Sequence, residues 1–172
     1  MNEVLKAIQE RRSVRKFKPD PVPQELLDQV IQAGTWAASG RGKQAGIILA
    51  VTDRETRDML SKWNAAILGS DSDPFFGAPA VLVVLADKSA HTYVYDGSLV
   101  MGNLMLAAHS LGLGTCWIHR AKEEFESPEG KALLAKLGIE GDYEGIGHCV
   151  IGWPDGEAPA PKPRKENWVY KI

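Results

Sequence analysis

The sequence predicts an α+β fold in which helices flank a sheet. Two observations indicate this class. Helical and strand patterns interleave along the chain, but two helices come together at its start, and the strands are few for a doubly wound parallel sheet. A chain of 172 residues also fits a single domain, over residues 1–172, that can bury a substantial core.

Two helices are expected before the first strand. Asn2 can cap the first helix, which carries apolar residues on one face and runs into Arg11. Pro23 suits the first position of the second helix, and Gly34 lies near its end. The short, apolar and β-rich run 46–51 then predicts a strand.

The middle of the chain predicts a helix, a loop, a central strand and a buried helix. Asp53 can cap the first of these helices, and the Gly-, Asp-, Ser- and Pro-rich segment 69–79 predicts the loop. The run 80–86 is continuously apolar, which is typical of a strand buried on both faces. The helix over 96–111 is apolar nearly all round, so we expect it to be buried, in part by a second subunit.

The last third of the chain predicts two strands, one helix and an extended arm. The strands are expected over 115–118 and 146–151, and the helix between them has Ser127 as its cap and stops at Gly138. The arm, residues 153–172, is proline-rich at first and ends in large aromatic residues. Because these aromatics would be exposed unless they dock, we expect the arm to lie across a partner subunit.

Charge and hydropathy exclude several classes of protein. The formal net charge is −2 with both signs spread along the chain, so no global field would draw the protein to nucleic acid or to an anionic membrane. The N-terminus lacks the basic and apolar regions of a signal peptide, and no apolar run approaches the roughly 20 residues that span a bilayer. A soluble cytoplasmic protein is therefore expected.

Most recognisable motifs are missing. Cys116 and Cys149 lie in apolar runs, as expected for buried, reduced thiols. The four histidines show no ligand spacing with each other or with the cysteines, so no metal site is expected. The glycine-rich fingerprint of a dinucleotide site, the P-loop and the Gly-x-Ser-x-Gly elbow of hydrolases do not occur.

The densest local signal is the basic run Arg-Arg-Ser-Val-Arg-Lys over 11–16, at the exit of the first helix. Its four cations and one hydroxyl could bind a phosphate. One alternative is a solvated helix end, where the macrodipole favours basic residues. Another is a nucleic-acid module, although no aromatic residue interleaves the arginines as a stacking platform requires.

A second basic cluster, Lys-Pro-Arg-Lys over 162–165, lies in the proline-rich arm. The prolines stiffen the backbone, which lowers the entropic cost of presenting the cations to an anion. Alone, this cluster indicates a solubilising tail. Both clusters together favour a shared anion site.

Four ordered parts of the chain resemble the signature of FMN-dependent nitroreductases, and together they span almost the whole sequence. They are Arg11-Arg12-Ser13-Val14-Arg15-Lys16-Phe17, Ala38-Ser39-Gly40-Arg41-Gly42-Lys43-Gln44, Leu111-Gly112-Leu113-Gly114-Thr115-Cys116-Trp117-Ile118, and Ile151-Gly152-Trp153-Pro154 with Lys162-Pro163-Arg164. The resemblance implies a mostly antiparallel central sheet. It also implies an intertwined homodimer, with FMN at the interface and an extended C-terminal arm.

The resemblance assigns both basic clusters to the FMN phosphate. The residues that would hold the phosphate, or support those that do, are Arg11, Arg12, Ser13, Lys162 and Arg164. Arg15 would lie near N1 and O2 of the isoalloxazine ring, where negative charge collects on reduction. A fixed guanidinium there would raise the flavin potential.

Two further segments would contact the ring. The segment expected to pack on it from the other subunit is Ala38, Ser39 and Gly40. The strand end expected against the opposite face is Trp117, Ile118 and His119. A main-chain N–H at or near His119 would be directed to flavin N5, so this histidine is not expected to be a general base. The aromatic candidates for covering the substrate face are Trp63, Phe75, Phe76, Tyr93 and Tyr95.

The resemblance implies an oxidoreductase that uses NADPH or NADH to reduce nitroaromatics, quinones or related small acceptors by a ping-pong mechanism. Because the flavin does the chemistry, no catalytic side chain need be conspicuous, and none is. Two alternatives stay open: a flavin-binding sensor or carrier without turnover, and a specialised branch such as a dehalogenase or a dehydrogenating oxidase.

Overall fold

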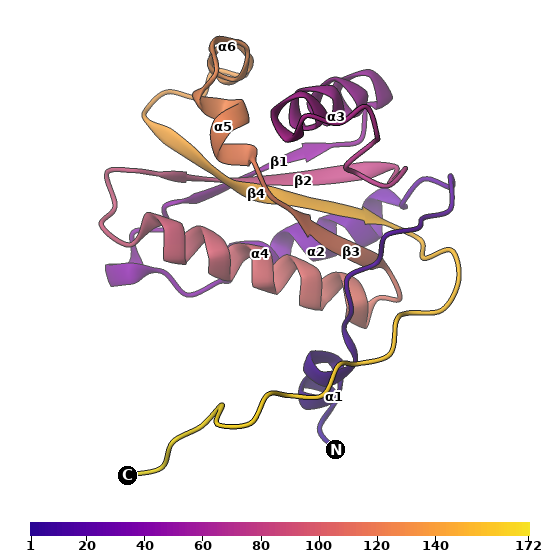
Figure 1. The fold of residues 1–172 in the computed structure, drawn as a ribbon. Helices are drawn as coiled ribbons and strands as arrows, with labels where there is room; N and C mark the ends of the chain where they lie inside the picture. The colour runs from indigo at the N-terminus through magenta and orange to yellow at the C-terminus, as the bar shows by residue number, and fades with distance from the viewer.

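A four-stranded sheet lies between two layers of helices in the computed structural model, which describes residues 1–172 (Figure 1). The strands are β1 (Gly46–Val51), β2 (Ala80–Asp87), β3 (Gly114–Ile118) and β4 (Tyr143–Gly152). The helices are α1 (Glu3–Glu10), α2 (Gln24–Thr35), α3 (Arg54–Leu68), α4 (Tyr93–Ser110), α5 (Ala121–Glu126) and α6 (Pro128–Lys136), with a 3-10 turn η1 (Gly40–Gly42). The sheet order is β1-β2-β4-β3 and every neighbouring pair is antiparallel, so the predicted α+β class is confirmed.

The central strand β2 contributes to both cores because successive side chains of a strand point to opposite faces. Val81, Val83 and Leu85 pack with residues of α3, α5 and α6. Leu82 and Val84 pack with residues of α2 and α4. Figure 1 shows these two groups of helices on opposite sides of the sheet. The continuous apolar run of β2 is therefore what a sheet covered on both faces requires.

Two helices differ from the sequence prediction. Helix α4 begins at Tyr93, three residues before the predicted start, and the Asp96 carboxylate lies in its first turn. It accepts hydrogen bonds from the N–H of Gly40 (3.0 Å) and the hydroxyl of Thr92 (3.1 Å). Helix α5 was not predicted. It follows Arg120, whose φ is 77°, and it has no side-chain cap that would reveal it in the sequence.

Strand β4 begins at Tyr143, three residues earlier than predicted. Its first half contains Gly145 and Gly147, which weaken a strand pattern. Both glycines are required by packing, because a Cβ at Gly145 would collide with the carbonyl of Ala121 and one at Gly147 would collide with the Trp117 indole. The close approach of Ala121 therefore explains why a glycine, Gly145, stands in the part of the strand that was missed.

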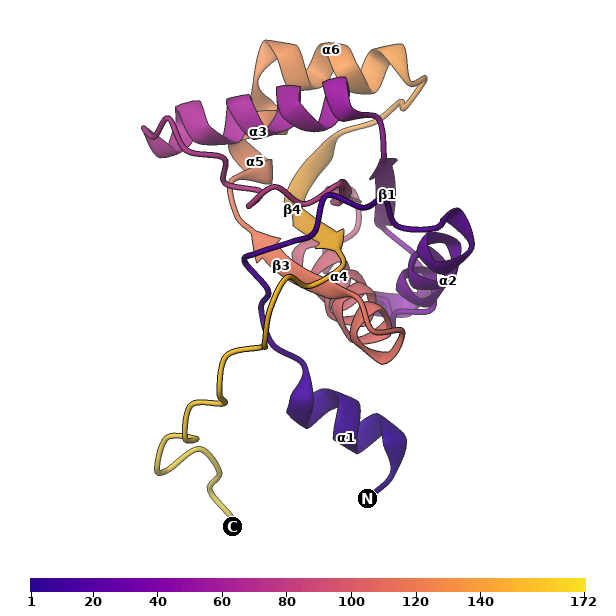
Figure 2. The ribbon, with the colours of Figure 1, turned by 90° about the vertical axis from the view of Figure 1, so that its right-hand side faces the viewer.

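Both ends of the chain leave the layered body on the same side. Figure 2 shows α1 and the C-terminal arm as separate segments below the sheet, and Figure 1 shows the same arrangement. Helix α1 has no buried residue, and the arm is exposed from Gly156 onward. Isolated helices shorter than about 12 residues are marginal in water, so α1 depends on packing, which α4 supplies within the chain.

Candidate functional site

The basic segment after α1 is bound to the end of the sheet by its main chain. The N–H of Val14 donates to the carbonyl of Thr115 on β3 (2.8 Å). The N–H of Asp155, just beyond β4, donates to the carbonyl of Lys16 (3.0 Å). The segment therefore lies beside the start of β3 and the exit of β4.

Two glycines let this segment lie close to the sheet. A Cβ on Gly114 would lie 2.8 Å from the side chain of Val14, and one on Gly152 would lie 2.6 Å from Pro79 and 3.0 Å from Phe17. These distances are too short for real contacts, so a larger residue at either position would displace its neighbours. The position of the basic segment is thus set by packing as well as by hydrogen bonds.

Arg11 presents a buried nitrogen that has no hydrogen-bond partner. Its Nη1 atom bonds to no group of the chain, although a buried charged donor is costly to leave unpaired. Arg12 differs, because its Nη1 atom donates to the carbonyls of Gln9 (2.6 Å) and Arg11 (2.8 Å). The unpaired guanidinium of Arg11 therefore fits an anionic ligand such as a phosphate, which accepts strong bonds from arginine.

Three of the predicted site residues lie in the neighbourhood of Cys116 in β3, where Ser13 forms a bridge with Thr115. Burial raises the pKa of Cys116, and three neighbours act against that rise. Arg15 and Arg11 do so by positive charge, and Ser13 does so through a hydrogen bond. The structure therefore brings these three residues together at one place. Burial also raises the pKa of Cys149 to about 12, so this second thiol is not a reactive group.

The first part of the C-terminal arm forms a groove with the basic segment, and the rest of the arm does not. A cavity of about 230 Å³ is lined by residues 13–16 and 154–159. Farther along, Arg164 and Lys162 are exposed, and a guanidinium nitrogen of Arg164 donates to the Lys162 carbonyl (2.8 Å). No hydrogen bond or ion pair joins either residue to Arg11, so one chain alone does not assemble both clusters around one point.

The end of β3 presents a main-chain N–H at His119. Ile118 is buried in the core, and the indole of Trp117 packs on Gly147. His119 itself is exposed, and its N–H makes no hydrogen bond within the chain. Its carbonyl, in contrast, accepts a hydrogen bond from the Asn64 side chain (2.8 Å). The main chain of His119 is therefore held on one side and free on the other.

The segment 38–40 lies at the opposite end of α4 from the basic segment (Figure 1). Gly40 is bonded to Asp96 in the first turn of α4, whereas Val14 packs on Gly114, just after the last turn. Helix α4 has 18 residues, which at the usual rise makes it about 27 Å long. Within one chain, these two groups of predicted residues are therefore far apart.

A model of the nitroreductase family matches residues 8–155, which is most of the chain. The chain belongs to the nitroreductase family. It is similar to the FMN reductase (NAD(P)H) of Bacillus subtilis, with 32% identity over 181 residues that cover 95% of this chain and 70% of that relative. It is also similar to the NADPH-flavin oxidoreductase of Vibrio harveyi, with 30% identity over 189 residues that cover 95% of this chain and 70% of that relative.

A solved structure of another family member has the same fold. The crystal structure of a nitroreductase with bound FMN from Bacteroides fragilis superimposes with a TM-score of 0.90 at 26% identity. The superposition covers 100% of both chains. The predicted nitroreductase-like fold is therefore confirmed along the whole length of the chain.

Sequence reasoning missed a polar network behind His119 in this nitroreductase-family protein. Its side chains are Asn64, Arg120, Glu124 and His148, joined by hydrogen bonds. Asn64 and Glu124 are 60 residues apart, so no short motif links them. The one signal in the sequence is a histidine inside the apolar run that forms β4.

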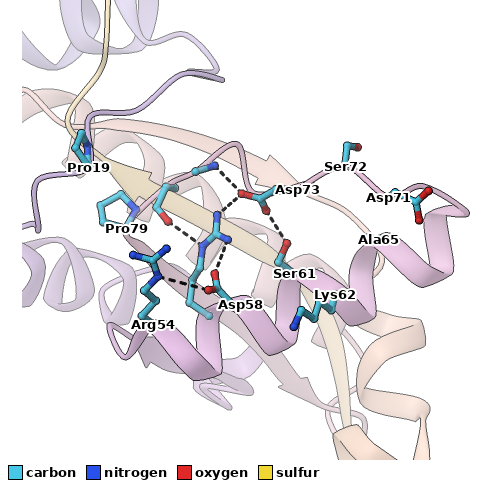
Figure 3. Close-up of a pocket in the computed structure, with 13 residues that line it drawn as sticks. Pro19, Arg54, Asp58, Ser61, Lys62, Ala65, Asp71, Ser72, Asp73 and Pro79 are labelled. Atoms are coloured by element: carbon cyan, nitrogen blue, oxygen red, sulfur yellow. Dashed lines mark hydrogen bonds and ion pairs between the residues drawn. The ribbon is translucent and has the colours of Figure 1, made fainter.

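A large cavity lies away from all the predicted site residues, between α3 and the loop before β2 (Figure 3). It measures about 630 Å³. The buried Arg57 is fully paired there, with Asp73 (2.6 Å), Asp58 (3.0 Å) and the carbonyl of Ala78 (2.9 Å). Burial alone would raise the pKa of Asp73. Hydrogen bonds from Arg57, Ser61 and the main-chain N–H groups of Gly77 and Phe75 together outweigh burial, so the pKa is lowered. These paired charges bind the loop to α3.

The aromatic candidates for the substrate face divide by exposure. Phe75 is fully buried, and Trp63 packs against the same core. The hydroxyl of Tyr93 is bonded to a carboxylate of β4 (3.2 Å). Phe76 and Tyr95 remain exposed, so only these two are free to cover a substrate.

The structure also bears on metals and membranes. No group of three or more His, Cys, Asp or Glu side chains is arranged to hold a metal ion. No helix combines the length and the apolar character that crossing a bilayer requires.

Proposed function

We propose that this chain is an FMN-dependent oxidoreductase that takes electrons from NADPH or NADH and reduces a nitroaromatic, a quinone or a related small acceptor. The observation that carries the proposal is the buried, unpaired Nη1 atom of Arg11 in a member of the nitroreductase family. The relatives named FMN reductase and NADPH-flavin oxidoreductase support it, as does the FMN in the Bacteroides fragilis structure.

Arg11 and Ser13 are proposed to bind the FMN phosphate. The guanidinium would supply a charge-assisted hydrogen bond, and the serine hydroxyl a second donor. Lys162 and Arg164 would complete the site, because both are exposed cations that no acid of the chain neutralises. Within the chain, the two residues are bonded only to each other, so we infer that contact with the phosphate holds their segment in place.

When bound, FMN would supply a ring that accepts a hydride from the nicotinamide and passes electrons to the acceptor. The residues of the chain set the surroundings of that ring. Arg15 lies near Ser13 and would place a fixed positive charge where reduction adds negative charge. The free N–H of His119 would donate to N5, while its exposed imidazole would take no part in the chemistry.

A homodimer with FMN between protomers is part of this proposal. The segment 38–40 and the basic segment are separated by the length of α4, about 27 Å, which is longer than one FMN molecule. A two-fold pairing would bring the first segment of one protomer to the second segment of its partner. Large apolar side chains that are exposed in one chain, as is typical of an interface, are Val4, Leu5, Ile8, Trp36, Tyr95, Leu99, Trp168, Val169 and Tyr170.

The direct test is to purify the protein and examine any bound chromophore. We expect a yellow protein that releases FMN on denaturation, is bleached by NADPH or NADH without oxygen, and regains its colour when a nitroaromatic or a quinone is added. A colourless protein that cannot be loaded with FMN would contradict the proposal.

The same experiment separates a sensor or carrier and a dehalogenase from the proposed function. A dehydrogenating oxidase, the third alternative, would instead have its FMN reduced by an organic substrate and reoxidised by oxygen. FMN that binds but is not reduced by either nicotinamide would indicate a sensor or carrier. FMN that is reduced by a nicotinamide but reoxidised only by a halogenated substrate would indicate a dehalogenase branch. Assays with both nicotinamides against a panel of acceptors would then name the reductant and the acceptor class.

A further inference from the structure

A buried chain of hydrogen bonds runs from the middle of β4 to the end of β3. The Nε2 atom of His148 lies 2.8 Å from Oε2 of Glu124, and both side chains are fully buried. The other oxygen of Glu124 accepts from the amide of Asn64. The same amide nitrogen donates to the carbonyl of His119 (2.8 Å), so the chain of bonds ends at the main chain of the proposed site.

Asn64 also holds the residue that follows His119. The Nε atom of Arg120 donates to the side-chain oxygen of Asn64 (3.0 Å). Arg120 has a φ of 77°, which is a costly conformation for a residue with a Cβ. Asn64 is therefore bonded to both residues of the turn that joins β3 to α5, and this turn needs support from its surroundings.

This network is not explained by stability alone. Burying a carboxylate, an imidazole and an amide in one place has a large desolvation cost, which apolar side chains of similar size would avoid. The Nδ1 atom of His148 is buried without a partner, which adds to that cost. Such networks specify one arrangement of the groups that they hold, which here are the main-chain atoms of His119 and Arg120.

We propose that Asn64, held by Glu124 and His148, is a positioning residue that fixes the main chain of His119 and so sets how its N–H meets the flavin ring. This inference rests on the proposed function, because it needs FMN at the end of β3. Ile118 is held by its pairing with His148 in the sheet, and the carbonyl of His119 is held by Asn64. The N–H of His119 lies between these two fixed points, so its orientation is fixed as well.

The N–H of His119 should favour the binding of oxidised FMN over that of reduced FMN. N5 can accept a hydrogen bond in the oxidised ring, whereas in the reduced ring N5 carries a hydrogen. A loosened donor therefore weakens the binding of oxidised FMN more than that of reduced FMN, and by linkage the reduction potential of the bound flavin rises. A residue with only a structural role would weaken both forms equally and leave the potential unchanged.

The test compares Asn64→Ala with Ser61→Ala, one turn earlier on α3. Ser61 is also buried and also makes a strong hydrogen bond, to Asp73 (2.6 Å), but this bond faces the cavity in Figure 3 rather than His119. We expect Asn64→Ala to weaken the binding of oxidised FMN roughly 3- to 30-fold. The binding of reduced FMN should be less affected, so the reduction potential of the bound flavin should rise. Ser61→Ala should lower thermal stability and leave both affinities and the potential unchanged.

A second pair of variants covers the case in which Asn64→Ala does not fold. His148→Gln keeps a hydrogen-bonding side chain beside Glu124, whereas His148→Leu removes it. We expect His148→Gln to keep a potential near that of the unaltered protein and His148→Leu to raise it. If Asn64→Ala or His148→Leu folds and binds FMN with unchanged potential and affinity, the inference is wrong. If the unaltered protein binds no FMN, the proposed function fails instead.

Discussion

The first basic stretch of this chain is held firmly, and the second is not. Residues 11–18 are joined to the sheet by main-chain hydrogen bonds to Thr115 and Trp153. They also pack closely against Gly114 and Gly152. Residues 162–165 make one hydrogen bond, between a side chain and a carbonyl of the same stretch. Folding therefore holds one half of the proposed phosphate site in place, whereas fixing the other half around a phosphate would have a cost in entropy.

The firm half can be tested by removing one of two adjacent arginines. Arg11→Ala should weaken FMN binding roughly 10- to 100-fold, because it removes a buried charged donor from the phosphate. Arg12→Ala removes the same charge, but its guanidinium is already bonded to two carbonyls, so a loss of less than about threefold is expected. Fluorescence titration with FMN measures both. Equal losses would mean that net charge, rather than the unpaired nitrogen, controls binding.

The loose half can be tested through the aromatic residues at its end. Trp168 is 64% exposed and Tyr170 is 80% exposed in one chain, so both are expected to dock on a partner. Replacing both with serine should weaken self-association about tenfold or more, with little change in the stability of the protomer. Sedimentation equilibrium gives the association constant, and Glu157→Ser, also in the arm, is the control. Unchanged association would remove the arm from the interface.

The third and smallest expected effect is on thermal stability. The loop before β2 is held to α3 by the ion pair of Asp73 with Arg57, whereas the first basic stretch is held by main-chain hydrogen bonds. The folded-state pKa of Asp73 is lowered, so its carboxylate stabilises the fold above the unfolded-state pKa, and this contribution is lost as pH falls through the folded-state pKa. Asp73→Asn should therefore lower the melting temperature at neutral pH, and the difference should shrink below about pH 4. A difference that stays constant from pH 7 to pH 3 would show that the charge is not responsible.

Most of the fold could be predicted because its signals are local. The strand 80–86 is apolar at every position, and the helix caps Asn2, Asp53 and Ser127 all accept the hydrogen bonds expected of them. Helix α5 was missed because the residue before it, Arg120, adopts a conformation that its side chain disfavours. Only the tertiary structure stabilises that turn.

The candidate site was predictable only in part, for a related reason. The basic run over 11–16 stands out in the sequence, and its proximity to Cys116 agrees with a shared role. Asn64, Glu124 and His148 do not stand out, because each is a single polar residue and only the fold brings them together. The two basic stretches make no hydrogen bond or ion pair with each other in one chain, so their proposed meeting at a phosphate could not be predicted from this fold.

The most direct test of the central claim compares FMN with riboflavin, which lacks the phosphate, on the unaltered protein and on Arg11→Ala. If the buried nitrogen of Arg11 binds the phosphate, the unaltered protein should bind FMN much more tightly than riboflavin. Arg11→Ala should remove most of that preference while leaving riboflavin binding nearly unchanged. Equal affinities for the two flavins in the unaltered protein, or an equal loss for both in the variant, would contradict the account.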